Sequence, residues 1–177
     1  MNMIKILGIK ITDRIKEAGL TQGILSKYAS LITTRLGFHE LTTELCSREA
    51  YMLLHLTGDS VETGKLFSEL KAIGGIDVRE LTFDDSKPFV NFGSEEGALR
   101  IIGILVEKKE YEVIAELQKI LTSYGCVIRT RLGVNEEFFG EPAGLIIIEL
   151  VGDEIQMDLL ENDLQKLPKV VLRKLVF

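Results

Sequence analysis

Apolar positions follow two different periods along this chain, and the periods alternate in a fixed order. Runs rich in β-branched and aliphatic residues are typical of strands, and they lie at 3–11, 30–38, 51–57, 76–83, 99–106, 126–134, 144–151 and 170–177. Between them, apolar residues recur every three or four positions, which predicts helices. The helices are expected from Asp13 to Tyr28, from Val61 to Ile73, and over 109–124 and 154–166. Each half of the chain therefore reads β-α-β-β-α-β.

The two halves also share sequence. Residues 32–37 read Ile-Thr-Thr-Arg-Leu-Gly, and residues 128–133 read Ile-Arg-Thr-Arg-Leu-Gly. With these stretches aligned, Tyr28 matches Tyr124, and the Gly-Asp pair at 58–59 matches the pair at 152–153 with a small shift. Self-similarity at a period of one small domain predicts a duplication.

The repeated element order predicts an α+β fold made of two tandem ferredoxin-like domains. Domain 1 is expected at 1–83, a linker at 84–96 and domain 2 at 97–177. Right-handed crossovers place both helices of a domain on one face of a four-stranded antiparallel sheet, with strand order 4-1-3-2. The central strands are apolar on both faces, so the face without helices, or a sheet edge, is expected to contact the other half or another subunit.

Composition limits the functional classes. The chain has 177 residues, 46% of them hydrophobic, and a net charge of −6. It lacks the concentrated basic face that binding to nucleic acid requires. No apolar run is long enough to cross a membrane and no signal peptide is visible. With only two cysteines, at non-equivalent places in the repeat, the sequence predicts a reduced cytoplasmic protein.

Motifs for catalysis are missing from the sequence. It has no nucleophile elbow, and its histidines and cysteines do not form a pattern with a base and an orienting acid. No phosphate-binding glycine loop follows either first strand. We therefore expect a protein that is not an enzyme and that has no cofactor.

His39, Cys46 and His55 are the metal-capable residues that lie near one hairpin. Imidazole and thiolate ligands would suit a transition-metal sensor. Strand pairing sets His55 near Arg35, roughly 13 Å from His39 at about 3.3 Å per residue. A metal site would therefore need ligands shared between subunits, and ordinary structural roles are favoured.

Arg35 and Arg131 are the most interesting polar residues of the repeated stretch. If the apolar positions of these strands face the helices, both arginines face the other side. Such guanidinium groups could bind a small carboxylate or another anion at an interface. The alternative is a structural cross-strand pair, with Arg129 or Arg131 beside Glu149, or Arg35 beside His55.

The turns between the first strand and first helix of each domain are the other candidate anion sites. They contain Thr12 and Asp13 in the first domain, and Glu107 and Lys108 in the second. Helix N-termini present free N–H groups to anions, although simple helix capping explains the same residues. The acidic pair at 136–137 is typical of a solvated loop.

The element order, the repeat length and the Arg-Leu-Gly that ends the second strand resemble those of ACT-type regulatory domains. The second half resembles more narrowly a small ACT-like family of regulators assigned to the iron-only hydrogenase system. That resemblance rests on Ile-Ile-Gly-Ile-Leu-Val-Glu at 101–107, Tyr-Gly at 124–125 and Ile-Arg-Thr-Arg-Leu-Gly-Val at 128–134. It covers 97–177 well and 3–83 more loosely.

The resemblance implies a non-catalytic regulatory protein. ACT-type domains typically bind amino acids or similar small molecules between paired domains, and relatives with the same fold bind nickel. Neither domain here has the glycine-rich first loop of an amino-acid site, and no DNA-binding segment is attached, so regulation would act through a partner protein. We expect a homodimer that binds a small effector at an interface; the alternatives are a protein–protein adaptor and a metal-responsive sensor.

Overall fold

The computed structural model describes residues 4–38, 47–84, 99–107 and 109–177. The chain divides into two compact units, residues 4–82 and 83–177. Expectations that concern His39, Cys46, Lys108 and nearly all of the linker at 84–96 therefore lie outside the described residues.

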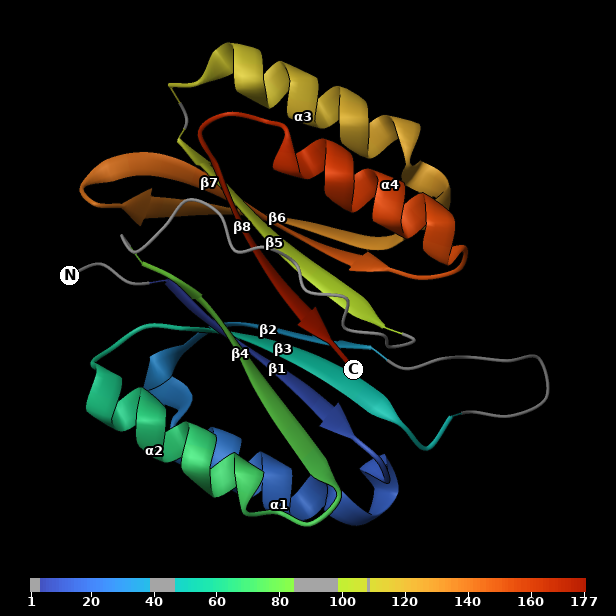
Figure 1. Cartoon of the computed structure of the whole chain (residues 1–177). Coiled ribbons are helices and arrows are strands. Elements are labelled where there is room, and N and C mark those ends of the chain that lie inside the picture. Colours follow the sequence, from blue (N-terminus) through green and yellow to red (C-terminus); the bar gives the residue numbers. More distant parts are fainter. Residues whose placement is uncertain (1–3, 39–46, 85–98, 108) are drawn as a thin grey trace. The chain divides into compact units, whose positions relative to one another are not determined.

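The first domain has the predicted element order (Figure 1). Its elements are β1 (Ile4–Ile11), α1 (Arg14–Lys27), the short 3₁₀ helix η1 (Ala29–Leu31), β2 (Ile32–Phe38), β3 (Ala50–Leu56), α2 (Ser60–Lys71) and β4 (Ile76–Phe83). The strand order is β2-β3-β1-β4, which confirms the predicted order. The β3 strand pairs antiparallel with both β1 and β2.

The second domain repeats this arrangement. Its elements are β5 (Arg100–Glu107), α3 (Tyr111–Ser123), η2 (Gly125–Val127), β6 (Ile128–Phe138), β7 (Glu141–Leu150), α4 (Glu154–Gln165) and β8 (Val170–Val176). The strand order β6-β7-β5-β8 is the counterpart of the first. The predicted α+β class with two ferredoxin-like domains is confirmed.

In each domain the two helices lie side by side on one face of the sheet (Figure 1). The core of the first domain lies between α1, α2 and the sheet, and includes Leu7, Ile9, Leu25, Leu54, Leu66 and Leu70. The core of the second includes Ile102, Ile104, Leu117, Ile148, Leu160 and Leu172. Burying each such aliphatic side chain contributes about 1.5–3 kcal/mol, so this face holds each domain together.

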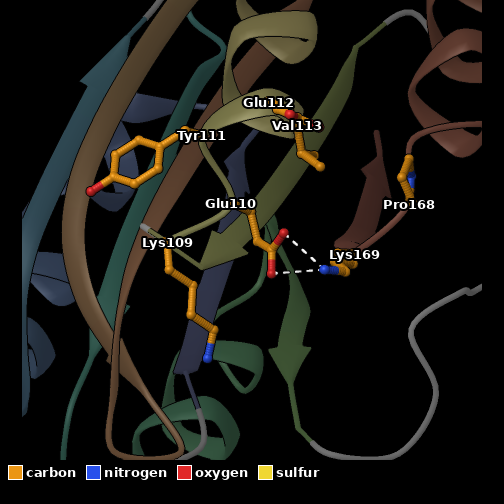
Figure 2. A pocket seen from close by; sticks show the side chains of 7 residues that line it. All are labelled: Lys109, Glu110, Tyr111, Glu112, Val113, Pro168 and Lys169. Atoms are coloured by element: carbon orange, nitrogen blue, oxygen red, sulfur yellow. Dashed lines mark hydrogen bonds and ion pairs between the residues drawn. The ribbon is translucent and has the colours of Figure 1, made fainter.

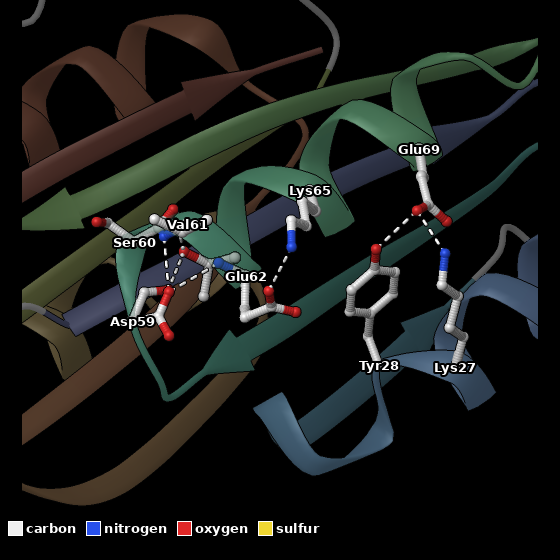
Figure 3. A network of polar contacts seen from close by, with 9 residues as sticks. Lys27, Tyr28, Asp59, Ser60, Val61, Glu62, Lys65 and Glu69 are labelled. Atoms are coloured by element: carbon white, nitrogen blue, oxygen red, sulfur yellow. Dashed lines mark hydrogen bonds and ion pairs between the residues drawn. The ribbon is translucent and has the colours of Figure 1, made fainter.

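In the described part of the chain, three of the four α-helices begin with an aspartate that caps them. Asp59 Oδ1 accepts hydrogen bonds of 2.8 Å from the backbone N–H groups of Val61 and Glu62 (Figure 3). Asp13 and Asp153 cap α1 and α4 in the same way. The α3 helix has no side-chain cap, and this difference positions the candidate site described below.

A tyrosine links the two helices of each domain. The hydroxyl of Tyr28, at the end of α1, donates a 2.7 Å hydrogen bond to Glu69 on α2 (Figure 3). Lys27 Nζ lies 2.6 Å from the same carboxylate oxygen. In the second domain the hydroxyl of Tyr124 donates a 2.7 Å bond to Asp163. Both copies of the duplicated tyrosine therefore connect the helices at the same place.

The second domain also holds a buried group of charges beneath α4. Arg100 on β5 contacts Glu161 at 3.1 Å, and Lys174 on β8 contacts the other oxygen of Glu161 at 3.0 Å. All three side chains are less than 9% exposed. Arg100 also pairs with Asp158 at 2.5 Å, so two cations meet two carboxylates and the charges balance.

The hairpin of β6 and β7 is longer than predicted. Glu136 and Glu137 lie inside β6, opposite Ala143 and Pro142, so the loop expected at 136–137 is wrong. The strands are joined by a two-residue turn in which Phe139 has φ 51° and Gly140 has φ 81°. Two positive φ values match the right-handed twist of the flanking strands, and this lets pairing continue to the end of the hairpin.

Candidate functional site

A hollow of about 450 Å³ lies in the second domain, where α3 begins and where the chain turns from α4 into β8. Figure 2 shows the residues that line it. They are Lys109, Glu110, Tyr111, Glu112, Val113, Pro168 and Lys169.

The N-terminus of α3 borders the hollow, and this helix starts without a side-chain cap. Glu110 occupies the N-cap position, but its side chain makes no capping hydrogen bond. The first-turn N–H groups of a helix have no partner within the helix, and the helix dipole adds partial positive charge at this end. Among the residues that the structure describes, no aspartate side chain caps α3, so the helix start is available to negatively charged groups.

The side chain of Glu110 pairs instead with Lys169. Lys169 Nζ donates to both carboxylate oxygens of Glu110, at 3.0 Å each (Figure 2). The Glu110 side chain is 19% exposed and that of Lys169 is 65% exposed. The pair connects the start of α3 with the turn before β8.

Lys169 holds this position at an energetic cost. Its φ is 58°, in the left-handed region that costs a residue with a Cβ about 1 kcal/mol. Gly75 stands directly before β4 as Lys169 stands directly before β8, and its φ is 83°. At the position where the first domain has Gly75, the second domain has the ammonium group of Lys169. Strained positions of this kind gather at binding sites.

The charges of the lining residues balance. The lining contains two lysines, Lys109 and Lys169, and two glutamates, Glu110 and Glu112. Lys109 Nζ also lies 2.8 Å from Glu107, and this hydrogen bond raises the pKa of the lysine. The lining therefore presents groups of both signs and no net charge.

The lining also contains two apolar residues, Val113 and Pro168. Figure 2 shows Val113 of α3 and Pro168 of the following turn on opposite sides, with the Glu110–Lys169 pair between α3 and this turn. Tyr111 points away from that pair and is 78% exposed. Such a site combines charge recognition with small apolar surfaces.

The predicted turn residues lie close to this region only in the second domain. Glu107 ends β5 and binds Lys109. The turn was predicted because a helix N-terminus presents free N–H groups, whereas Lys169 was missed because Pro168 indicated only a helix end. Its position opposite Gly75 in the repeat could have revealed it.

In the first domain, Thr12 and Asp13 have structural partners. The N–H of Thr12 donates a 2.9 Å hydrogen bond to the carbonyl of Gly75. Asp13 caps α1, and its second oxygen lies 2.8 Å from Arg48. These contacts match the simple capping alternative for this turn.

The predicted direction of the repeated arginines is wrong. Arg35 pairs in register with Leu54, a core residue on the helix side of the sheet. Its guanidinium donates a 2.9 Å bond to Gln22 of α1. A register shift between Ile32 and Thr34 moves the rest of the strand to the opposite alternation.

The second copy repeats this contact. Arg131 pairs in register with Ile148 on the helix side, and its guanidinium contacts Gln118 of α3. Gln22 and Gln118 stand 96 positions apart, as do Arg35 and Arg131. The repeated arginines therefore link each outer strand to the first helix of its domain.

The structural pairing proposed for the neighbouring residues is found at Arg129. It lies 3.2 Å from Glu149, which also accepts a 2.6 Å hydrogen bond from Thr130. In the first domain Thr33, not Arg35, lies beside His55, with 2.9 Å between Oγ1 and Nδ1. Burial lowers the pKa of His55.

Metal binding by His39, Cys46 and His55 involves two residues outside the described part of the chain. Within that part, no group of three or more His, Cys, Asp or Glu side chains could hold a metal ion. No helix among the described residues is long and apolar enough to cross a membrane.

Comparisons with known proteins give the following result. No protein-family model and no curated protein matches the chain. An uncharacterized protein from Thermotoga maritima matches with 25% identity over 47% of this chain and 100% of its own, with a TM-score of 0.41.

Two further solved structures match most of the chain at low identity. The acetolactate synthase small subunit from Thermotoga maritima covers 97% of this chain and 96% of its own at 9% identity, with a TM-score of 0.36. Chlorite dismutase from Candidatus Nitrospira defluvii covers 97% of this chain and 90% of its own at 11% identity, with a TM-score of 0.40. These low values support no assignment of function.

Proposed function

We propose that this chain is a non-catalytic regulatory protein with tandem ACT-like domains, and that its second domain binds a small effector in the hollow at the start of α3. The observation that carries the proposal is the uncapped start of α3 beside the strained Lys169 and its partner Glu110. The family assignment is supported by the sequence resemblance at 101–107 and 128–134.

The lining residues favour a zwitterion. A carboxylate would accept hydrogen bonds from the first-turn N–H groups of α3 and from Lys169. An ammonium group would lie among the carboxylates of Glu110 and Glu112. A purely anionic ligand would leave these two carboxylates close to its charge, which is unfavourable in a partly enclosed site.

The two apolar lining residues limit the rest of the ligand. Val113 and Pro168 offer a short apolar surface with no hydrogen-bonding side chain. A neutral α-amino acid with a small or medium aliphatic side chain therefore fits the charge pattern and this surface best. Pockets for small molecules start at about 300 Å³, so the hollow is large enough for one such ligand.

Regulation requires that the effector bind one state of the protein better than another. In the proposed site the ligand contacts both α3 and the turn before β8. It would tighten the connection that the Glu110–Lys169 pair already makes. We propose that a homodimer transmits this change to a partner protein in the cytoplasm.

A thermal-unfolding screen tests the proposal directly. The full chain is heated with each common amino acid, with inorganic phosphate and sulfate, and with divalent metals with and without chelator. A ligand that binds only the folded state stabilises it by about 2.7 kcal/mol at a hundredfold excess over Kd. We expect a dose-dependent shift from neutral amino acids. A flat panel on well-folded protein would contradict effector binding and favour a protein–protein adaptor.

The Lys169→Gly variant separates binding from folding. Glycine relieves the left-handed strain of about 1 kcal/mol, while the lost surface ion pair and the freer unfolded chain cost about as much. The free energy of unfolding should therefore change by less than about 1 kcal/mol, whereas the ligand-induced shift should disappear. Lys166→Ala is the matched control, because it removes an exposed lysine pair with Asp163 outside the lining. A Lys169→Gly variant that still responds fully would exclude this site.

A further inference from the structure

The first domain fills with its own residues the place that is hollow in the second domain. The segment before β3 lies against the start of α1. The backbone N–H of Arg14 donates a 2.8 Å hydrogen bond to the carbonyl of Arg48, and Arg14 Nε donates a 2.9 Å bond to the carbonyl of Ser47. These bonds fasten residues 47–48 beside the first turn of α1.

The helix start itself is also occupied. Asp13 Oδ1 accepts hydrogen bonds from the N–H groups of Ile15 and Lys16, at 3.2 and 3.3 Å. The other oxygen, Oδ2, lies 2.8 Å from Arg48 Nη2. The first turn of α1 therefore already has a carboxylate, and that carboxylate already has a cation.

The turn before the last strand is closed as well. Glu17 is 4% exposed, and a Cβ built on Gly75 would lie 3.7 Å from its carboxylate. Glu17 thus lies over the glycine that corresponds to Lys169. Counted back from Tyr28 and Tyr124, the residue at this helix position in the second domain is Val113. A buried glutamate in one domain corresponds to a short apolar side chain lining the hollow in the other.

We infer that the chain has one effector site and not two: the second domain binds the ligand, and the first domain keeps the duplicated site closed. This inference rests on the proposed function. The ligand class is the neutral zwitterion proposed above. In the first domain, the carboxylate of Asp13 and the cation of Arg48 occupy the helix start, where the charged groups of such a ligand would bind.

Binding in the first domain would require these contacts to break. A ligand carboxylate would have to displace Asp13 from the N–H groups of α1, and Glu17 would have to leave the space above Gly75. Each hydrogen bond lost without replacement weakens binding by about tenfold. The two sites should therefore differ in affinity by a hundredfold or more, on the order of two such losses.

The test is a backbone amide titration by NMR on the full chain, with glycine, L-alanine, L-valine and L-leucine as probes. We expect saturating shifts at Lys109–Val113 and Lys169, and none at Asp13–Glu17 or Gly75. Calorimetry with the probe that gives the largest shifts should give one molecule per chain.

Two variants sharpen this result. Lys169→Gly should abolish the shifts in the second domain without moving binding to the first. Arg48→Ala, which removes the partner of Asp13 in the first domain, should leave the affinity of the second-domain site unchanged.

The possible failures differ in meaning. Two molecules per chain, or shifts at Asp13–Glu17, would overturn the single-site inference and leave effector binding intact. No heat and no shift with any of the four probes would contradict the zwitterion class and, with a flat thermal screen, the proposed function itself.

Discussion

Tyr28 and Glu69 connect the two helices of the first domain through a hydrogen bond of 2.7 Å between the hydroxyl and Oε1. Tyr124 and Asp163 make the same connection in the second domain, also at 2.7 Å. Each tyrosine ends the first helix, where the chain leaves it for the outer strand. The bond thus fixes the distance between the helices at the point where the backbone changes direction.

Removing one hydroxyl should weaken the domain that contains it. Tyr124→Phe leaves the carboxylate of Asp163 without this donor and keeps the ring, so we expect a loss of about 1 kcal/mol in the free energy of unfolding. Urea unfolding followed by circular dichroism measures it. Tyr111→Phe is the control, because this ring is 78% exposed and its loss of a hydroxyl should change nothing measurable. Equal values for the two variants would show that the helix connection contributes no stability.

The same contact predicts a pH dependence. Hydrogen bonds from Lys27 and Tyr28 lower the pKa of Glu69 below its ordinary value of 4.5. A carboxyl group with a lowered folded-state pKa contributes stability that is present above the unfolded pKa and is lost as pH falls through the folded pKa. The free energy of unfolding of the Glu69→Gln variant should therefore fall less than that of the unchanged protein as the pH is lowered below 4.5. Carbon-detected NMR titration should show the Glu69 pKa of the Tyr28→Phe variant moving back up; an unchanged pKa would mean that Tyr28 has no influence.

The buried charges beneath α4 should be sensitive to the loss of one member. Arg100 and Lys174 are each only 8% exposed, and Glu161→Gln removes the carboxylate that they share. Breaking a buried pair in this way costs about 3 kcal/mol or more. Chemical unfolding measures the loss. The triple variant Arg100→Met, Glu161→Leu and Lys174→Met should cost less than the single change, because no unpaired charge remains buried. A triple variant that is less stable than the single one would contradict this reasoning.

The contact between Arg131 and Gln118 should be structural and weak. The contact is exposed to solvent on the helix-covered side of the sheet. Arg131→Ala should therefore change the free energy of unfolding by less than about 1 kcal/mol. Effector affinity, measured by calorimetry, should stay the same, because the site at Lys169 does not include Arg131. Lost binding in a stable Arg131→Ala variant would instead return this arginine to the list of ligand contacts.

The fold could be predicted from the sequence because the two halves describe the same domain twice. Residues 109–124 have a clear apolar stripe, and this supported the helix before Tyr28, where Gly19 and Gly23 weaken the pattern. The strand order then followed from the handedness of the connections. Element order and topology depend on the whole pattern, so single irregular residues did not disturb them.

Side-chain direction on the outer strands could not be predicted in the same way. One register shift, between Ile32 and Thr34 or between Ile128 and Thr130, reverses the side on which Arg35 or Arg131 lies. Nothing in the alternation of residue types reveals such a bulge. The hairpin turn at Phe139 and Gly140 was missed for a related reason, since phenylalanine is not a residue that usually adopts positive φ.

The repeated contact between an arginine and a glutamine has a consequence for solubility. β2 and β6 are the outermost strands at one edge of their sheets. Outer strands can recruit foreign strands and so initiate aggregation, and charged side chains on them oppose this. Gln22 and Gln118 contact Arg35 and Arg131 and so orient a positive charge on each of these two strands, which opposes pairing with a further strand.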